Sequence, residues 1–239
     1  KPSRGLVPMG PKALEGWMGL SVHNVISRSV RDSALLLQLS QGPEAGSRVL
    51  PPTHNLMDAL RKPPKGLRIA LMETNPFGMG VHADCLDAVR QAAALCARLG
   101  HHVEPAAPRL PIQEMFAGMG VMTGAGMLTA VQAREKALGR AVREDELEPL
   151  NWRSLQLAKG YRAEQVFAAR SVFDQAGRLL DEFFAGYDLI LSPVTAAPPP
   201  LLGELSLDQP WERFVKAAVL ASPFTAIFNM SGHPAMSVP

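Results

Sequence analysis

The sequence predicts a protein of the α/β class, and two observations support this prediction. A short apolar run at Arg68–Met72, a helical pattern over Ala83–Leu99 and a second short run at His101–Glu104 follow one another in that order. Strand, helix and strand in succession form a βαβ unit, which favours a parallel pair of strands with a right-handed crossover. A further buried strand at Tyr187–Ser192, after several helical segments, fits the same class.

The N-terminal third predicts a strand and a capped helix. Leu20–Ile26 is strongly β-prone, and a helix is expected over Val30–Gln41. Ser29 can accept a hydrogen bond from a free amide of the first turn, and Asp32 lies near the positive end of the helix. Residues 44–65 contain two proline pairs and little periodicity, which indicates a surface excursion or linker.

The βαβ unit is defined by its boundaries. Arg68–Met72 is bounded by glycine and by an Asn-Pro pair, as expected of a buried strand. Gly100 ends the following helix, and the apolar residues of that helix recur at helical spacing. These apolar residues are Leu86, Val89, Ala93 and Cys96.

A long helical segment is predicted from Pro111 to about Leu138, with a cluster of four glycines in its middle. The glycines break the pattern, or else they let a helix bend or pack closely, with a softly lined pocket as a second interpretation. Two more helices are expected at Trp152–Lys159 and Ala163–Phe184. The second is predicted to present one apolar face consisting of Phe167, Val172, Ala176, Leu179 and Phe183.

The C-terminal part predicts a strand, a helix and a strand. Tyr187–Ser192 is a buried strand, Trp211–Leu220 is helical and Phe224–Val238 carries the last strand. No apolar run is long enough to span a membrane.

Composition limits the classes of partner. A 47% hydrophobic content in 239 residues supports a buried core, in one large domain or two small ones. A net charge of +2 gives no single-signed field for nucleic acid or an anionic membrane. Cys85 and Cys96 stand on one predicted helix about 16 Å apart by helical rise, which is too far for a disulfide. Free thiols favour a reducing, cytoplasmic compartment.

The common signatures of nucleophilic catalysis are absent from the sequence. No Gly-x-Ser-x-Gly run occurs, because Gly19–His23 has the wrong fifth residue, and no serine has a lysine three positions later. A triad assembled in space from distant Ser, His and Asp residues remains open.

Other candidate sites are weak. His82, Cys85, Cys96, His101 and His102 match no common zinc spacing, so no metal is predicted.

Two further runs also favour a structural interpretation. Gly118–Gly124 looks like a dinucleotide loop, but its third glycine is one position late and no strand precedes it. The acidic residues of 144–148 are more typical of a solvated face than of paired catalytic carboxylates.

Four blocks of the sequence together resemble the amidase signature family. Lys1–Gly5 is similar to the Lys-Pro-Ser/Thr run that follows the family's signature segment, and Gly19–Ala34 is similar to the next block, a strand leading into a capped helix. Asp188–Pro193 with Pro198–Pro200 resembles its late core strand and loop, and Phe224–Ala235 its penultimate block. The four blocks occur in the family's order over essentially the whole chain.

The resemblance implies an α/β/α layered fold with a mixed central sheet, incomplete at both chain ends, and a single domain over 1–239. It also implies hydrolysis of a carboxamide to an acid and ammonia or an amine. The family uses a serine nucleophile, a second serine in a cis peptide that relays a proton, and a lysine as the ultimate base. Backbone amides stabilise the oxyanion, and no metal or organic cofactor takes part.

This sequence departs from the family at its catalytic residues. In the family all three precede the run that is here Lys1-Pro2-Ser3, so none can be assigned to this chain, which is predicted to be inactive alone. The substrate-pocket candidates that remain are Met122, Met127, Thr225 and Phe228, with core packing as the competing interpretation. Family members also continue past Val238.

The expected partner is a small amide substrate of the full-length parent, with no nucleic acid and no membrane. A homodimer and a complementing N-terminal segment are both open as protein partners. The alternative function is a non-catalytic scaffold or partner-binding subunit derived from an amidase. A nucleotide-binding α/β domain rests on the βαβ unit alone.

Overall fold

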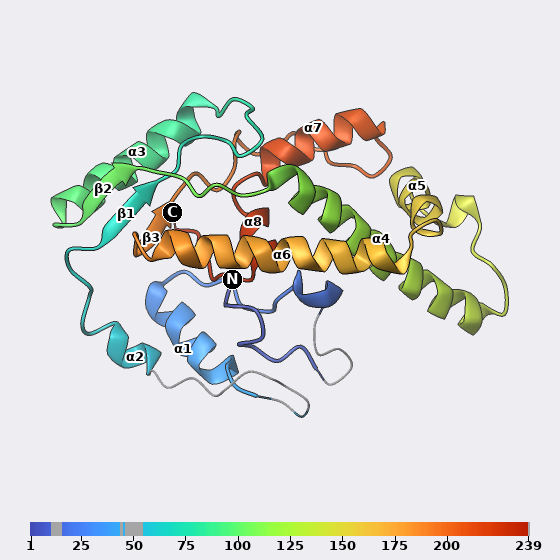
Figure 1. Ribbon diagram of the computed structural model, residues 1–239, viewed down its shortest axis with the longest axis horizontal. Helices are drawn as coiled ribbons and strands as arrows, with labels where there is room; N and C mark the ends of the chain where they lie inside the picture. Colours follow the sequence, from blue (N-terminus) through green and yellow to red (C-terminus); the bar gives the residue numbers. More distant parts are fainter. Residues whose placement is uncertain (11–15, 44, 46–54, 239) are drawn as a thin grey trace.

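The computed structural model describes residues 1–10, 16–43, 45 and 55–238. Three parallel strands form its sheet in the order β2-β1-β3: β1 is Arg68–Leu71, β2 is His102–Pro105 and β3 is Leu189–Leu191. The sheet lies at one end of the molecule, and the long helices extend away from it (Figure 1). The βαβ prediction and its parallel pairing are therefore confirmed, and every strand pair within the described ranges is parallel.

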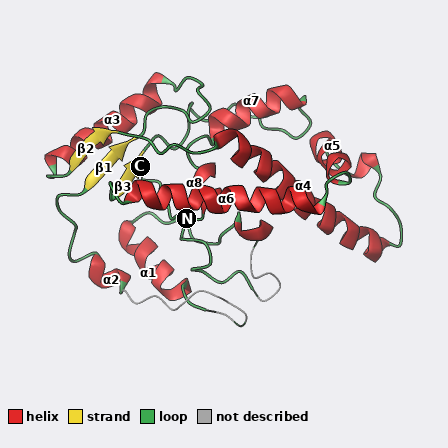
Figure 2. Ribbon diagram, in the orientation of Figure 1, coloured by secondary structure: helices red, strands yellow, loops and turns green. Residues whose placement is uncertain are grey.

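Helices make up most of the rest of the chain (Figure 2). The α-helices are α1 Val30–Ser40, α2 Leu56–Ala59, α3 Ala83–Arg98, α4 Ile112–Leu138, α5 Pro149–Ala158, α6 Ala163–Phe184, α7 Trp211–Ala221 and α8 Ala226–Ser231, with short 3-10 turns η1 Trp17–Gly19 and η2 Glu144–Glu146. Most of the predicted helices occur within a few residues of their expected bounds. Helix α5 begins three residues earlier than predicted, because Pro149 takes the first helical position, where its missing N–H is not needed.

Strand β1 is the buried centre of the sheet. Ile69 is 3% exposed and Ala70 is fully buried. Strand β3, which was predicted to be buried, is an edge strand of the described sheet, and Leu189 is 49% exposed. The apolar side chains of β3 are therefore only partly covered by the described residues.

Helix α4 is continuous, so the prediction of a break at its glycines was wrong. Gly118 lies against α6, where a Cβ would come within 3.2 Å of the Ala169 Cβ atom, and Gly124 lies against Tyr161. The small residues let α4 approach its neighbours closely, as the alternative interpretation of this segment proposed. Close packing along this face offsets the low helix propensity of glycine.

The buried face of α6 agrees with the predicted one only in part: Ala176 is buried as predicted. Ala169, Phe173, Ala176 and Leu180 are buried, whereas Phe167 is 76% exposed. The helix has apolar residues on a broad arc, and contact with α4 and α8 decides which part of this arc is buried. The core between these helices includes Met115 and Met122 of α4 together with Phe224, Ile227 and Met230.

Two predicted strands are absent from the described residues. The strand predicted at Leu20–Ile26 is not formed: no described segment pairs with residues 22–26, and among the described residues Ser21 makes only an isolated bridge to Gly16. Phe224–Val238 contains helix α8 in place of a strand: Ile227, Phe228 and Met230 turn into the core, and Gly232 ends the helix in a left-handed conformation. Residues 44 and 46–54 of the predicted excursion at 44–65 lie outside the described residues, and its described part includes α2.

The predicted cap of α1 is present. The Ser29 hydroxyl accepts a hydrogen bond from the Asp32 amide at 3.1 Å. We expect Ser29→Ala to lower the free energy of unfolding by about 1 kcal/mol, because it leaves one amide of the first turn without its side-chain acceptor. Urea denaturation of the two proteins measures the difference, and Ser29→Asp, which keeps the cap, is expected to restore it. A loss of stability equal in both variants would contradict a capping role.

Candidate functional site

The carboxyl ends of β1 and β3 define the place where a sheet of this topology binds a ligand. From β1 the chain first passes to β2 on one side of β1, and later returns to form β3 on the other side. Open parallel sheets bind ligands in the crevice outside such a switch point, beyond the carboxyl ends of the strands. Here the two loops that leave β1 and β3 meet: the His82 amide donates to the Ala196 carbonyl at 2.8 Å.

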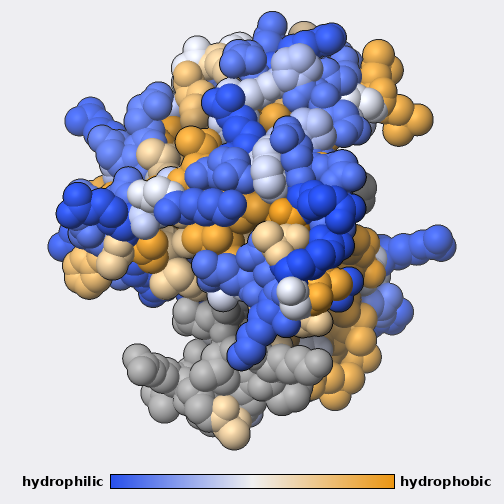
Figure 3. Space-filling view, turned by 90° about the vertical axis from the view of Figure 1, so that its right-hand side faces the viewer, coloured by the Kyte–Doolittle hydropathy of each residue, from blue (hydrophilic) through white to orange (hydrophobic). Residues whose placement is uncertain are grey.

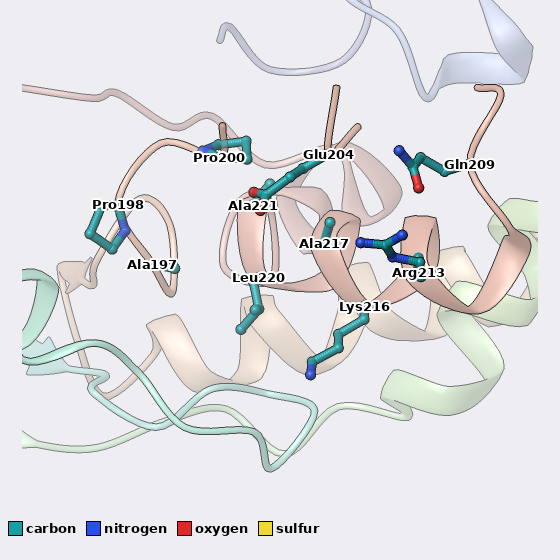
Figure 4. A pocket seen from close by; sticks show the side chains of 10 residues that line it. All are labelled: Ala197, Pro198, Pro200, Glu204, Gln209, Arg213, Lys216, Ala217, Leu220 and Ala221. Atoms are coloured by element: carbon teal, nitrogen blue, oxygen red, sulfur yellow. The ribbon is translucent and has the colours of Figure 1, made fainter. Parts of the chain in front are cut away.

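A groove of about 380 Å³ lies beside this edge, between the proline-rich loop after β3 and helix α7 (Figure 4). The Ala196 amide donates to the Leu220 carbonyl at 2.8 Å, which holds the loop and the helix together at the end of the groove. The lining combines small apolar residues with four polar side chains, those of Glu204, Gln209, Arg213 and Lys216. A groove of this size and mixed lining is typical of sites for small molecules.

Asn75 marks the same edge of the sheet from the β1 side. It is 2% exposed, and its side-chain oxygen accepts a hydrogen bond from the Phe77 amide at 2.9 Å. Its Nδ2 atom is buried without a hydrogen-bond partner among the described residues. A buried amide nitrogen of this kind calls for a polar partner such as water or a bound group.

The four pocket candidates predicted from the resemblance do not form one pocket. Met122 and Phe228 belong to the same buried core, where Met122 is 1% exposed and Phe228 is 9% exposed. Thr225 is exposed. Met127 lines a second groove of about 400 Å³ near the end of α4. Core packing therefore accounts for two of the four within this chain, and the role of all four in a substrate pocket stays a prediction.

The groove at Met127 is closed on one side by an ion pair. The Arg140 guanidinium donates to both carboxylate oxygens of Glu146, at 2.9 and 2.7 Å, and the Arg143 amide donates to the same carboxylate. These hydrogen bonds, with that from Arg140 the largest influence, lower the pKa of Glu146 to about 2. The predicted solvated acidic run thus has one member that fixes a loop.

A serine, a histidine and an aspartate come together at the end of α8. Ser231 Oγ lies 3.2 Å from His233 Nδ1, and His233 Nε2 lies 3.1 Å from Asp181 Oδ1 of α6. No spacing rule could have found this set, because Asp181 is 52 positions from His233. Among the described residues, no other serine, histidine and aspartate are joined in this way by hydrogen bonds.

The surroundings of Ser231 are unsuited to a nucleophile. It is the last residue of α8, and the C-terminal end of a helix carries partial negative charge, which opposes a developing oxyanion. The neighbouring Gly232 amide already donates a hydrogen bond to the Phe228 carbonyl, at 3.2 Å. Neither groove described above is lined by these residues. We interpret the chain of hydrogen bonds as a tie between α8 and α6.

Lys1 also lies at this end of α8. Its Nζ atom donates to the backbone carbonyls of His233 at 2.6 Å and Pro2 at 2.9 Å. Burial, with a smaller contribution from the Arg4 charge, lowers the pKa of the Lys1 ammonium to about 8. In this structure the Lys1 ammonium is therefore held by backbone carbonyls beside the end of α8.

Residues 1–4 run beside residues 232–235. The Arg4 amide donates to the Gly232 carbonyl at 2.9 Å, and the Ala235 amide donates to the Lys1 carbonyl at 3.0 Å. The Arg4 guanidinium adds a hydrogen bond to the Met230 carbonyl at 2.6 Å. Segments from the two ends of the chain thus support one another around the C-terminal end of α8.

Within the described ranges, no three His, Cys, Asp or Glu side chains come together as metal ligands. Cys85 and Cys96 are free thiols, both partly buried. No described helix combines the length and the apolar character needed to cross a lipid bilayer.

Comparison with known proteins assigns the family. Residues 1–239 match the Amidase family profile over their whole length, and this chain belongs to that family. It is similar to the 6-aminohexanoate-cyclic-dimer hydrolase of Paenarthrobacter ureafaciens, with 30% identity over 257 residues covering 100% of this chain and 51% of that protein. It is also similar to the lipoamidase of Enterococcus faecalis, at 28% identity over 264 residues, covering 100% of this chain and 34% of that protein.

Solved structures confirm the fold. The structure of 6-aminohexanoate cyclic dimer hydrolase superposes with a TM-score of 0.84 at 26% identity, over 97% of this chain and 51% of that one. A bacterial aryl acylamidase of the amidase signature family superposes with a TM-score of 0.76 at 20% identity, over 98% of this chain and 49% of that one. The predicted α/β fold class is confirmed. The chain spans about half the length of the cyclic-dimer hydrolase.

Sequence reasoning missed the polar residues of the loop-and-helix groove. Arg213 and Lys216 lie on α7 where the sequence shows only an amphipathic helix, and Asn75 was noted only as a strand boundary. The signal that could have found Asn75 is its position just after a buried strand, where parallel sheets gather ligand-binding groups.

Proposed function

We propose that this chain is part of an amidase that hydrolyses carboxamide C–N bonds, and that it supplies walls of the substrate pocket and part of the supporting sheet. The family match over residues 1–239 carries this proposal. Hydrolytic relatives such as the cyclic-dimer hydrolase are about twice as long as this chain, which leaves room for catalytic groups outside it. The substrate is proposed to be a small amide.

In this proposal the bond-breaking groups are a serine nucleophile, a cis-peptide serine and a lysine that lie outside residues 1–239. The nucleophile attacks the carbonyl carbon while the neutral lysine takes its proton through the second serine. Backbone amides stabilise the oxyanion, the C–N bond breaks as the amine takes up a proton, and water then releases the acid from the acyl-enzyme. Met122, Met127, Thr225 and Phe228 are proposed to shape the pocket around the substrate.

A complementing segment is the protein partner that we propose, in preference to a homodimer. Large apolar side chains are exposed on the N-terminal part: Trp17 is 60% exposed, Ile26 is 104% exposed and Leu39 is 72% exposed. Apolar patches also interrupt the hydrophilic surface on the face shown in Figure 3. Such surface is typical of an interface. Its extent, together with the exposed edge of β3, supports covering by the remaining part of an amidase fold.

The proposed compartment is the cytoplasm. Cys85 and Cys96 are free and partly buried, as is usual for cysteines in a reducing environment.

The test combines turnover with active-site labelling. The purified chain is incubated with aryl amides and with a fluorophosphonate probe; we expect no turnover above that of buffer and no stoichiometric labelling, because Ser231 lacks an oxyanion site. Adding a segment that carries the two serines and the lysine is expected to restore both signals.

A matched control separates the two serine hypotheses. Ser231→Ala is expected to leave the restored activity and labelling unchanged. Labelling of the isolated chain that disappears in Ser231→Ala would contradict the proposal and would identify Ser231 as a nucleophile. A monodisperse, cooperatively folded chain that gains no activity from the segment would support the scaffold alternative instead.

A further inference from the structure

The charges of the groove between the proline-rich loop and α7 are not balanced within the described part of the chain. Arg213 and Lys216 line the groove, and the structure gives neither of them a hydrogen bond or an ion pair with any described residue. Glu204 is the one acidic residue of the lining, and its carboxylate accepts a hydrogen bond from the Leu201 amide at 3.0 Å. The lining thus contains two cations and one carboxylate, so one positive charge remains in excess.

The rest of the lining is apolar and small. The loop side contributes Ala197, Pro198 and Pro200, and the helix side contributes Ala217, Leu220 and Ala221 (Figure 4). Such walls bury methylene groups without offering hydrogen bonds, and each CH₂ removed from water contributes about 0.8 kcal/mol. The groove therefore combines a cationic region with a strip that suits a short aliphatic chain.

The position of the groove points to a binding role. It adjoins the carboxyl end of β3, whose loop is joined to the β1 loop by the hydrogen bond between His82 and Ala196. This is the switch point of the sheet, where open parallel sheets bind their ligands. A surface lysine and arginine in arbitrary positions would not combine these three properties of charge excess, apolar strip and sheet edge.

We propose that this groove binds a small aliphatic carboxylate, with its acid group between Arg213 and Lys216 and its chain along Leu220. A monoanion matches the single excess charge, whereas a dianion such as phosphate meets repulsion from Glu204. Gln209 adds a neutral donor at the same wall. The inference rests on the proposed function only for the origin of the ligand, because carboxylic acids are the class of product that amide hydrolysis releases.

The test is a calorimetric or NMR titration of the 239-residue chain with hexanoate. Hexanamide, which has the same chain without the charge, and inorganic phosphate are titrated in parallel. We expect hexanoate to bind with a dissociation constant that rises with salt concentration, and to bind at least about tenfold more tightly than either comparison ligand.

Variants locate the site. Arg213→Gln and Lys216→Gln each remove one exposed cation from the lining and are expected to weaken hexanoate about tenfold, in line with the loss of a charge-assisted hydrogen bond. Arg178→Gln removes a cation of α6 that is also exposed but lies outside the groove lining, and is expected to change the affinity less than about twofold. Circular dichroism of each variant confirms that it folds like the parent chain.

Several results would overturn the inference: no saturable binding of hexanoate by the folded chain, equal binding of hexanamide, tighter binding of phosphate, or equal weakening by Arg178→Gln. The readout is binding and needs no turnover, so it can fail while the chain still restores an amidase, and it can succeed in a chain that does not.

Discussion

Replacing Phe173 with alanine is expected to lower the free energy of unfolding by about 3–5 kcal/mol, the usual range for removing a buried aromatic ring. Phe173 is 1% exposed, and its ring lies between α6 and α4, where it would be 3.4 Å from a Cβ added at Gly118. The substitution removes the contacts of the ring and leaves a cavity that the long, mutually packed helices cannot easily close. Urea or guanidinium denaturation monitored by circular dichroism measures the loss.

Phe167 provides the matched control on the same helix. It is 76% exposed, so Phe167→Ala is expected to change stability by less than about 0.5 kcal/mol. Similar losses for the two variants would show that α6 buries a different face from the one described, nearer to the face expected from the sequence pattern.

Gly118→Leu is expected to destabilise the protein by about 1–3 kcal/mol through overpacking. A Cβ at this position would lie 3.2 Å from the Ala169 Cβ atom and 3.3 Å from its Cα atom, and the second of these belongs to backbone that cannot move aside. The longer leucine side chain would have to push α4 and α6 apart. Thermal or chemical denaturation measures the effect.

Gly120→Leu is the control for helix propensity. Gly120 is exposed and nothing lies within 4 Å of its Cβ position, so leucine there is expected to stabilise the helix by a few tenths of a kcal/mol to about 1 kcal/mol. Opposite signs at two glycines only two residues apart would show that contact with α6, and not backbone freedom, explains Gly118. Equal signs would contradict the close approach of the two helices.

Local sequence patterns correctly predicted the elements whose structure depends mainly on their own residues. The β1–α3–β2 unit and the bounds of α6 follow from short apolar runs, helical spacing and stop residues, and the structure confirms them. The wrong predictions concern segments whose secondary structure depends on contact with another part of the chain. Leu20–Ile26 has β-prone composition, but residues 22–26 have no described neighbour to pair with, and 226–231 fold as a helix because Ile227, Phe228 and Met230 reach a common core.

The candidate site was less predictable than the fold. Met122 was expected at a pocket wall because of its place in the family resemblance, but its surroundings depend on which side of α4 faces α6. The groove of Arg213 and Lys216 is formed by the loop after β3 and by α7, two segments that no periodicity relates. Asn75 becomes notable only once its amide is seen to be buried without a partner. The burial of Asn75 and the shape of the groove arise from tertiary contacts, and the sequence signal for Asn75 is limited to its position just after a buried strand.

The contact between residues 1–4 and 232–235 affects the order in which the molecule folds. Lys1 and Ala235 are 234 positions apart in the sequence. Joining such distant segments closes a very long loop, whose entropic penalty grows with the logarithm of its length and must be met before the contact contributes anything. Helices α4 and α6 can associate early through nearer neighbours. The terminal pairing is then a late event: in a ribosome-bound chain, residues 1–4 are made well before residues 232–235 and stay without these partners until all of the intervening polypeptide has been made.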